Sequence, residues 1–156
     1  MPSSKRKEIL DALKTTLEGI TVGMGYRSTV NTVEFSARML DKIADSELPH
    51  ISIIPGTETF NDSVGRVVST WLVDLVVNDK HAKDLTGITG IEVLSNWTTD
   101  IRRALYADAT LGLGGYCIVT LRTRQGSESH PDAADESKAT MILGLEIKFE
   151  EDIDAA

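Results

Sequence analysis

The chain has 156 residues, of which 41% are hydrophobic and 26% are charged, and its formal net charge at pH 7 is −8. This length fits one domain that buries a sizeable core. The acidic balance and the lack of a basic stripe exclude a protein that grips nucleic-acid phosphates. No stretch approaches the roughly 20 apolar residues of a membrane-spanning helix, and the first residues carry no signal-peptide pattern, so we expect synthesis in the cytosol.

The first half of the chain predicts two helices, two strands and a turn. Ile9, Leu13 and Leu17 recur at helical spacing on one face, and Ser3 or Ser4 can cap the helix that carries them. The expected elements are a helix over 5–20, a strand over 26–35, a short helix over 36–46, a strand over 50–54 and a turn over 55–62.

The second half predicts a long strand, a long helix and two closing strands. One face of the strand over 66–77 is almost wholly apolar and the other is half apolar, so we expect helices on one side and a further contact on the second. The helix over 91–107 gathers a set of apolar residues, which are Leu94, Trp97, Ile101, Ala104 and Leu105. Its outer face is expected to carry Asp100, Arg102, Arg103 and Asp108. The closing strands are expected over 116–124 and 138–149.

Two polar segments near the end of the chain cannot bury a core of their own. We expect 125–137 to be a long, mobile hairpin loop and 150–156 to be a frayed acidic tail. The predicted fold is a single α+β domain over 1–156, with a mixed or antiparallel β-sheet and the two main helices packed on one face. The expected core contains Leu13, Leu17, Trp71, Leu75, Leu94, Ile101, Leu143, Leu145 and Ile147.

No group of residues in the sequence has the spacing of a catalytic, cofactor or metal site. The three histidines, His50, His81 and His130, lie in separate regions, and Cys117 lies in an apolar strand, where we expect a buried small hydrophobic residue. The glycines in 111–115 follow a helix and precede a strand, whereas a phosphate loop follows a strand and opens a helix. We therefore expect no enzyme, no cofactor and no metal.

The order of the expected elements carries one more indication. It runs through a helix with Ile9-Leu-Asp-Ala-Leu13, the run Leu48-Pro-His-Ile-Ser-Ile53, a turn with Gly56-Thr-Glu58, a long strand, a helix with Asp100-Ile-Arg-Arg-Ala-Leu105 and two terminal strands. This order resembles the tail terminator proteins of long-tailed bacteriophages, which are also called minor tail or tail-completion proteins. The resemblance covers roughly residues 5 to 150 and is one of pattern, because the family has no signature motif. The loop at 125–137 is longer and more acidic than the family pattern requires.

The resemblance implies a structural protein that is made in the host cytoplasm and becomes part of the virion. It implies a ring of six subunits that caps the tail tube, ends tube polymerisation and offers a docking surface for the neck or head-completion protein, and for a sheath if the tail is contractile. It implies no catalysis, no cofactor and no sequence-specific binding of nucleic acid. An acidic balance suits this role, because negative walls repel the DNA that passes through the channel.

Charged residues in exposed segments are the candidates for contacts between subunits or with the tube. They are Glu58, Arg66, Arg102, Arg103, Glu128, His130 and Asp132. Glu58 and Arg66 are also expected to pair and to hold the turn between their strands. The alternatives that stay open are another neck or head–tail completion protein, a tube-forming subunit, a cytosolic ligand-binding or regulatory α+β domain, and an enzyme with an unrecognised site.

Overall fold

The computed structural model describes residues 4–35, 42–63, 65–80, 88–128 and 138–152. The elements in chain order are helix α1 (Lys5–Glu18), the 3-10 helix η1 (Val22–Met24), strand β1 (Thr32–Glu34), the 3-10 helix η3 (Asp45–Glu47), strands β2 (His50–Ser63) and β3 (Arg66–Lys80), helix α2 (Ile88–Ala107), and strands β4 (Cys117–Glu128) and β5 (Lys138–Asp152).

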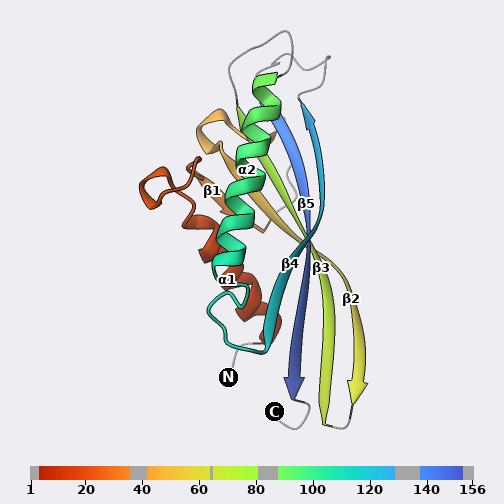
Figure 1. The fold of residues 1–156 in the computed structure, drawn as a ribbon. Coiled ribbons are helices and arrows are strands. Elements are labelled where there is room, and N and C mark those ends of the chain that lie inside the picture. The colour runs from red at the N-terminus through yellow and green to blue at the C-terminus, as the bar shows by residue number, and fades with distance from the viewer. Residues whose placement is uncertain (1–3, 36–41, 64, 81–87, 129–137, 153–156) are drawn as a thin grey trace.

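The strands form one mixed sheet in the order β1-β2-β3-β5-β4. Strands β1 and β2 are parallel, and the other neighbours are antiparallel. Both helices lie on one face of this sheet, and the ends of β2, β3 and β5 extend beyond them (Figure 1). The α+β fold and the burial of every expected core residue are confirmed.

The two helices form where the apolar spacing predicts them. Ser4 is the N-cap of α1, and its Oγ accepts a hydrogen bond from the Lys7 backbone N–H at 3.2 Å. The apolar residues of α1 and α2 and alternate residues of β3 and β5 join in one buried cluster. Burying one large aliphatic side chain contributes about 1.5–3 kcal/mol, so this cluster is the main source of stability.

Strand β2 is longer than the sequence indicates. The turn predicted over 55–62 is wrong, because β2 continues to Ser63 with an irregularity between Pro55 and Glu58. A bulge of this kind lets an edge strand accommodate a proline, which cannot donate a backbone hydrogen bond. The reversal into β3 lies further along, at Gly65, whose φ of 75° is a conformation that glycine adopts without a steric penalty.

The segment before β2 contains less regular structure than predicted. The strand expected over 26–35 is confined to β1, which pairs with residues 50–52 of β2. Part of the short helix expected over 36–46 falls at 36–41, outside the described residues. The described remainder contains only the short 3-10 helix η3.

The last two strands extend into segments that were expected to be irregular. Residues 125–128, assigned to the loop, continue β4 and pair with 139–142 of β5. Residues 150–152, assigned to the frayed tail, continue β5 and pair with 66–68 of β3. Both predictions are wrong for these residues, because backbone pairing with a neighbouring strand orders a segment that has little apolar surface of its own. The rest of the loop, 129–137, and of the tail, 153–156, lies outside the described residues.

The sheet face opposite the helices is covered at one end. By strand alternation this face carries His50, Ser52 and Asn78, which are buried but do not belong to the main core cluster. Asp45 of η3 forms an ion pair of 2.9 Å with Lys138 at the start of β5. Along β3, the same face carries Leu72, which is 48% exposed. The further contact predicted for this second face is therefore present over only part of it.

Candidate interaction surfaces

The residues predicted to form an interface do not gather in one place. Glu58 and Arg66 lie on the β2–β3 hairpin. Arg102 and Arg103 lie on α2, and Glu128 is the last residue of β4.

Two predicted interface residues, His130 and Asp132, lie outside the described residues. The others belong to separate surfaces, which are the hairpin end, the exposed side of α2 and the end of β4. The structure therefore presents several candidate contact surfaces in place of a single site.

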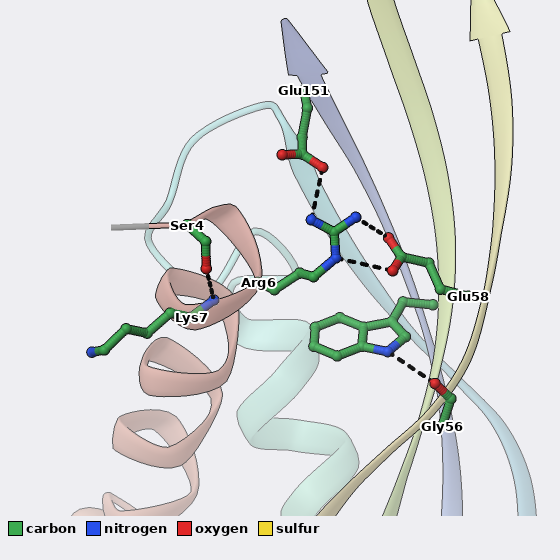
Figure 2. A network of polar contacts seen from close by, with 7 residues as sticks. Ser4, Arg6, Lys7, Gly56, Glu58 and Glu151 are labelled. Carbon is green, nitrogen blue, oxygen red and sulfur yellow. Dashed lines mark hydrogen bonds and ion pairs between the residues drawn. The ribbon is translucent and has the colours of Figure 1, made fainter. Parts of the chain in front are cut away.

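The predicted pairing of Glu58 with Arg66 is wrong. The Glu58 carboxylate accepts two hydrogen bonds from Arg6 of α1, at 2.9 Å from Nε and 2.7 Å from Nη2 (Figure 2). Arg66 forms its ion pair with Glu150 of β5, at 3.3 Å. Glu58 lies on the sheet face that bears the helices, opposite Trp71, whereas Arg66 alternates onto the other face.

Arg6 is the centre of a polar cluster that ties α1 to the sheet. Its Nη1 lies 3.0 Å from Glu151 Oε1, so one guanidinium joins β2 and β5 to the helix (Figure 2). The same guanidinium lies over the ring of Phe149, 5.3 Å from its centroid. The hydrogen bonds to Glu58 raise the pKa of Arg6, although partial burial opposes that shift. Nothing in the sequence reveals this cluster, because Arg6 and Glu58 are 52 residues apart.

The sequence predicted Asp100 on the outer face of α2, and this prediction is wrong, because the residue is only 1% exposed. Its carboxylate accepts hydrogen bonds from the backbone N–H groups of Arg27, at 3.0 Å, and Ser28, at 2.8 Å. A carboxylate of this kind gives a hydrogen-bond partner to two backbone donors that would otherwise lie against the helix without one. Asp100 is therefore a structural residue that docks the segment before β1 onto α2.

The two arginines that follow Asp100 differ in their availability. Arg103 donates to the Gly25 carbonyl at 2.6 Å and lies over the Tyr26 ring, 5.0 Å from its centroid, so its guanidinium is occupied within the chain. Arg102 is exposed and forms no ion pair or hydrogen bond with any described residue. Of the two predicted contact residues on α2, only Arg102 is free to meet a partner.

The exposed part of the sheet face opposite the helices mixes apolar and charged side chains. Leu72 of β3 and Ile118 of β4 are 48% and 52% exposed. Between them, Glu146 of β5 forms ion pairs with Arg122 at 2.7 Å and with Lys148 at 3.6 Å. The hydrogen bond from Arg122 is the main cause of the lowered pKa of Glu146. Three of the charges on this face are thus paired within the chain, whereas Asp74 of β3 is exposed and has no ion pair among the described residues.

Reactive side chains are scarce in the part of the chain that the structure describes. Those residues contain no group of three or more histidine, cysteine, aspartate or glutamate side chains that could hold a metal ion. Cys117 is fully buried, as predicted, and burial raises the pKa of its thiol to about 11. A neutral, buried thiol is a poor nucleophile and a poor metal ligand. The turn at 111–115 follows α2 as predicted, and Asp108 accepts hydrogen bonds there from the backbone N–H groups of Thr110 and Gly112.

No protein-family model matches this chain, and no curated protein matches its sequence. None of the helices in the described residues is long and apolar enough to span a membrane. In the part of the chain that the structure describes, the fold is a single α+β domain with an exposed hairpin, a stretch of β2 edge without a neighbouring strand and an arginine on α2 without an ion pair. These surfaces are the basis for a functional proposal.

Proposed function

We propose that this chain is a tail terminator protein of a long-tailed bacteriophage. Six copies close into a ring that caps the tail tube, ends its polymerisation and presents a docking surface for the neck or head-completion protein. The proposal begins from the order of sequence elements, which resembles that family over most of the chain. The α+β domain with both helices on one sheet face provides a frame in which these elements pack together.

A ring requires two different contact surfaces on each subunit. Heterologous contacts join one patch of a subunit to a different patch of the next, and they close when the rotation between subunits divides a circle. The exposed side of α2 and the hairpin end are two such patches. At roughly 3.3 Å per residue, the 15 residues of β3 span about 50 Å, so one domain can reach across a subunit boundary.

The observation that carries the proposal is the complementary charge of these two patches. Arg102 on α2 is an exposed cation without an ion pair among the described residues. At the hairpin end, Arg6 pairs with Glu58 and Glu151, and Arg66 pairs with Glu150, so the carboxylate that remains exposed there without an ion pair among the described residues is Asp62. A basic group on one subunit and an acidic end on the next allow an acidic protein to assemble in spite of its net charge of −8.

Charge reversal at Arg102 tests the ring. Arg102→Glu should leave the fold intact, because the side chain is exposed, and should weaken ring formation most at low salt, where charges are least screened. The matched control is Lys80→Glu, an equal charge change on an exposed residue at the end of β3 whose side chain has no ion pair among the described residues. The mass of the assembly, measured by light scattering at low and high salt, should fall for Arg102→Glu alone.

The biological test uses phage that lack this gene. Tails without the protein should grow to irregular lengths or fail to join heads, and the wild-type gene supplied in trans should restore both. Tails of normal length joined to heads in the deletion strain would refute the proposal. Open-ended polymerisation of the purified protein would identify it as a tube-forming subunit.

A further inference from the structure

The two edges of the sheet differ in how they are protected. On the edge formed by β4, the Leu121 backbone N–H donates to the Tyr106 hydroxyl of α2 at 3.1 Å, and the strand register shifts between Leu121 and Thr123. Both features block the addition of another strand. On the other edge, β1 pairs with β2 only at residues 50–52, and no other described strand pairs with the rest of β2 on that side.

The free part of β2 is a regular strand from Glu58 to Ser63. These residues pair in continuous register with 66–71 of β3, beyond the irregularity that follows Pro55. Alternate residues of a strand direct their N–H and C=O groups to opposite neighbours, so this edge presents a row of unpaired backbone donors and acceptors. A segment that adds here as a strand would satisfy them.

The side chains along this edge define what can pair with it. The face that bears the helices carries every second residue of this stretch, which are Glu58, Phe60 and Asp62. Arg6 already neutralises Glu58, and Phe60 is 60% exposed. Asp62 is exposed and has no ion pair among the described residues. An incoming strand therefore meets an aromatic ring and, two residues further along, an uncompensated carboxylate.

A second copy of the same strand does not suit this edge. In an antiparallel pairing of two copies centred on Phe60, Asp62 of each copy lies opposite Glu58 of the other, whose carboxylate is already paired with Arg6, so no cation of the second copy compensates Asp62. The net charge of −8 adds a general repulsion between copies. A basic partner strand encounters attraction at the same positions.

We propose that the edge of β2 from Glu58 to Ser63 binds an extended segment of a partner protein by strand addition. The segment places an apolar side chain beside Phe60 and a lysine or arginine beside Asp62, with one residue between them. Main-chain hydrogen bonds supply the affinity, and these two side chains supply the selectivity. The inference does not depend on tail termination, because it follows from the edge alone.

Synthetic peptides provide the test. The first probe is an eight-residue peptide with blocked termini that alternates threonine with valine and lysine, and the second has glutamate in place of lysine. The basic peptide should shift the amide NMR signals of 58–63 and protect alternate amides from hydrogen exchange, whereas the acidic peptide should do neither. Titration gives the Kd for each.

Variants at Asp62 then test whether the charge of this residue contributes to binding of the basic peptide. An exposed ion pair contributes about 0.2–1 kcal/mol, so Asp62→Asn should weaken binding of the basic peptide by up to about fivefold, and Asp62→Lys should weaken it further. The matched controls are Glu92→Gln and Glu92→Lys, which make the same charge changes at an exposed residue of α2 and should leave the Kd unchanged.

Four outcomes would overturn the inference. They are an absence of binding by the basic peptide, equal binding of the basic and acidic peptides, amide shifts outside β2, and a doubling of the protein's mass through β2. The ring test depends on Arg102 and this test depends on Asp62, so the failure of one proposal is distinguishable from the failure of the other.

Discussion

Removing the Asp100 carboxylate should destabilise the fold more than its position on a surface helix suggests. The side chain is 1% exposed and accepts two backbone hydrogen bonds, from Arg27 and Ser28. Hydrogen bonds to a charged group contribute about 1.5–3 kcal/mol each, and a buried donor left without a partner costs about 1–3 kcal/mol. Because the segment can relax and admit water, we expect Asp100→Ala to lower the free energy of unfolding by about 2–5 kcal/mol. Asp100→Asn should cost less, because its amide oxygen can still accept one of the two bonds.

Urea denaturation followed by circular dichroism measures these changes, provided that the slope against urea stays constant between variants. The control is Glu92→Gln, at an exposed position of the same helix, which should change the free energy by less than about 0.5 kcal/mol. The amide signals of residues 27 and 28 should lose their protection from hydrogen exchange in Asp100→Ala. A cost below about 0.5 kcal/mol for Asp100→Ala, with those amides still protected, would refute the docking role of the carboxylate.

Three further predictions concern the core and the sheet. Ile101→Ala should lower the free energy of unfolding by about 2–5 kcal/mol, because the side chain is fully buried, and a cost near zero in urea denaturation would contradict its packing. Gly144→Ala should cost about 1–3 kcal/mol, because a Cβ there would lie 2.3 Å from Thr123 Oγ1, and the cost should shrink in a Thr123→Ala background. Burial raises the pKa of the Cys117 thiol to about 11, so the unfolded chain releases this proton at a lower pH than the folded protein does. The free energy of unfolding should therefore fall as the pH rises from the ordinary thiol pKa towards 11. In Cys117→Ala, which has no thiol at this position, the fall should be less steep. A thiol reagent at pH 8 should label only unfolded protein.

The parts of the fold that could be predicted from the sequence are those that burial patterns determine locally. The alternation along β3 identified the buried face of that strand, and Trp71 and Leu75 are buried on it. The helical spacing in α1 and α2 likewise identified the faces that pack on the sheet. Such patterns can be recognised without knowing the partner, because any apolar stripe of this period has to be buried.

Strand ends could not be predicted in the same way, because pairing partners fix them. Residues 125–128 and 150–152 are polar or acidic, yet both belong to strands because β5 or β3 supplies their backbone partners. In β2, a Pro-Gly pair that usually marks a turn is absorbed by an irregularity in the strand. In each case a contact distant in sequence overrides the local preference.

The polar contacts within the candidate surfaces could not be predicted either, because they also depend on partners distant in sequence. Arg6 meets Glu58 and Glu151, and Asp100 meets the backbone of residues 27 and 28, so each contact joins segments that are far apart in the chain. Helical periodicity placed Asp100 outside because only its spacing from the apolar residues was visible. The segment that covers it becomes evident only when the chain before β1 is seen to cross α2.

The exposed face opposite the helices shows why the candidate contacts lie elsewhere. Leu72 and Ile118 stand on β3 and β4, and the β5 strand between them carries Glu146 and Lys148. The two apolar side chains are thus separated by a charged row, and Glu146 also pairs with Arg122. Isolated apolar residues among charges need no partner to keep a protein in solution. Within the described residues, the features that a partner would still satisfy include the edge of β2 beyond β1, the Asp62 carboxylate and Arg102 on α2. Strand addition and charge pairing are therefore the contacts through which we expect this protein to act.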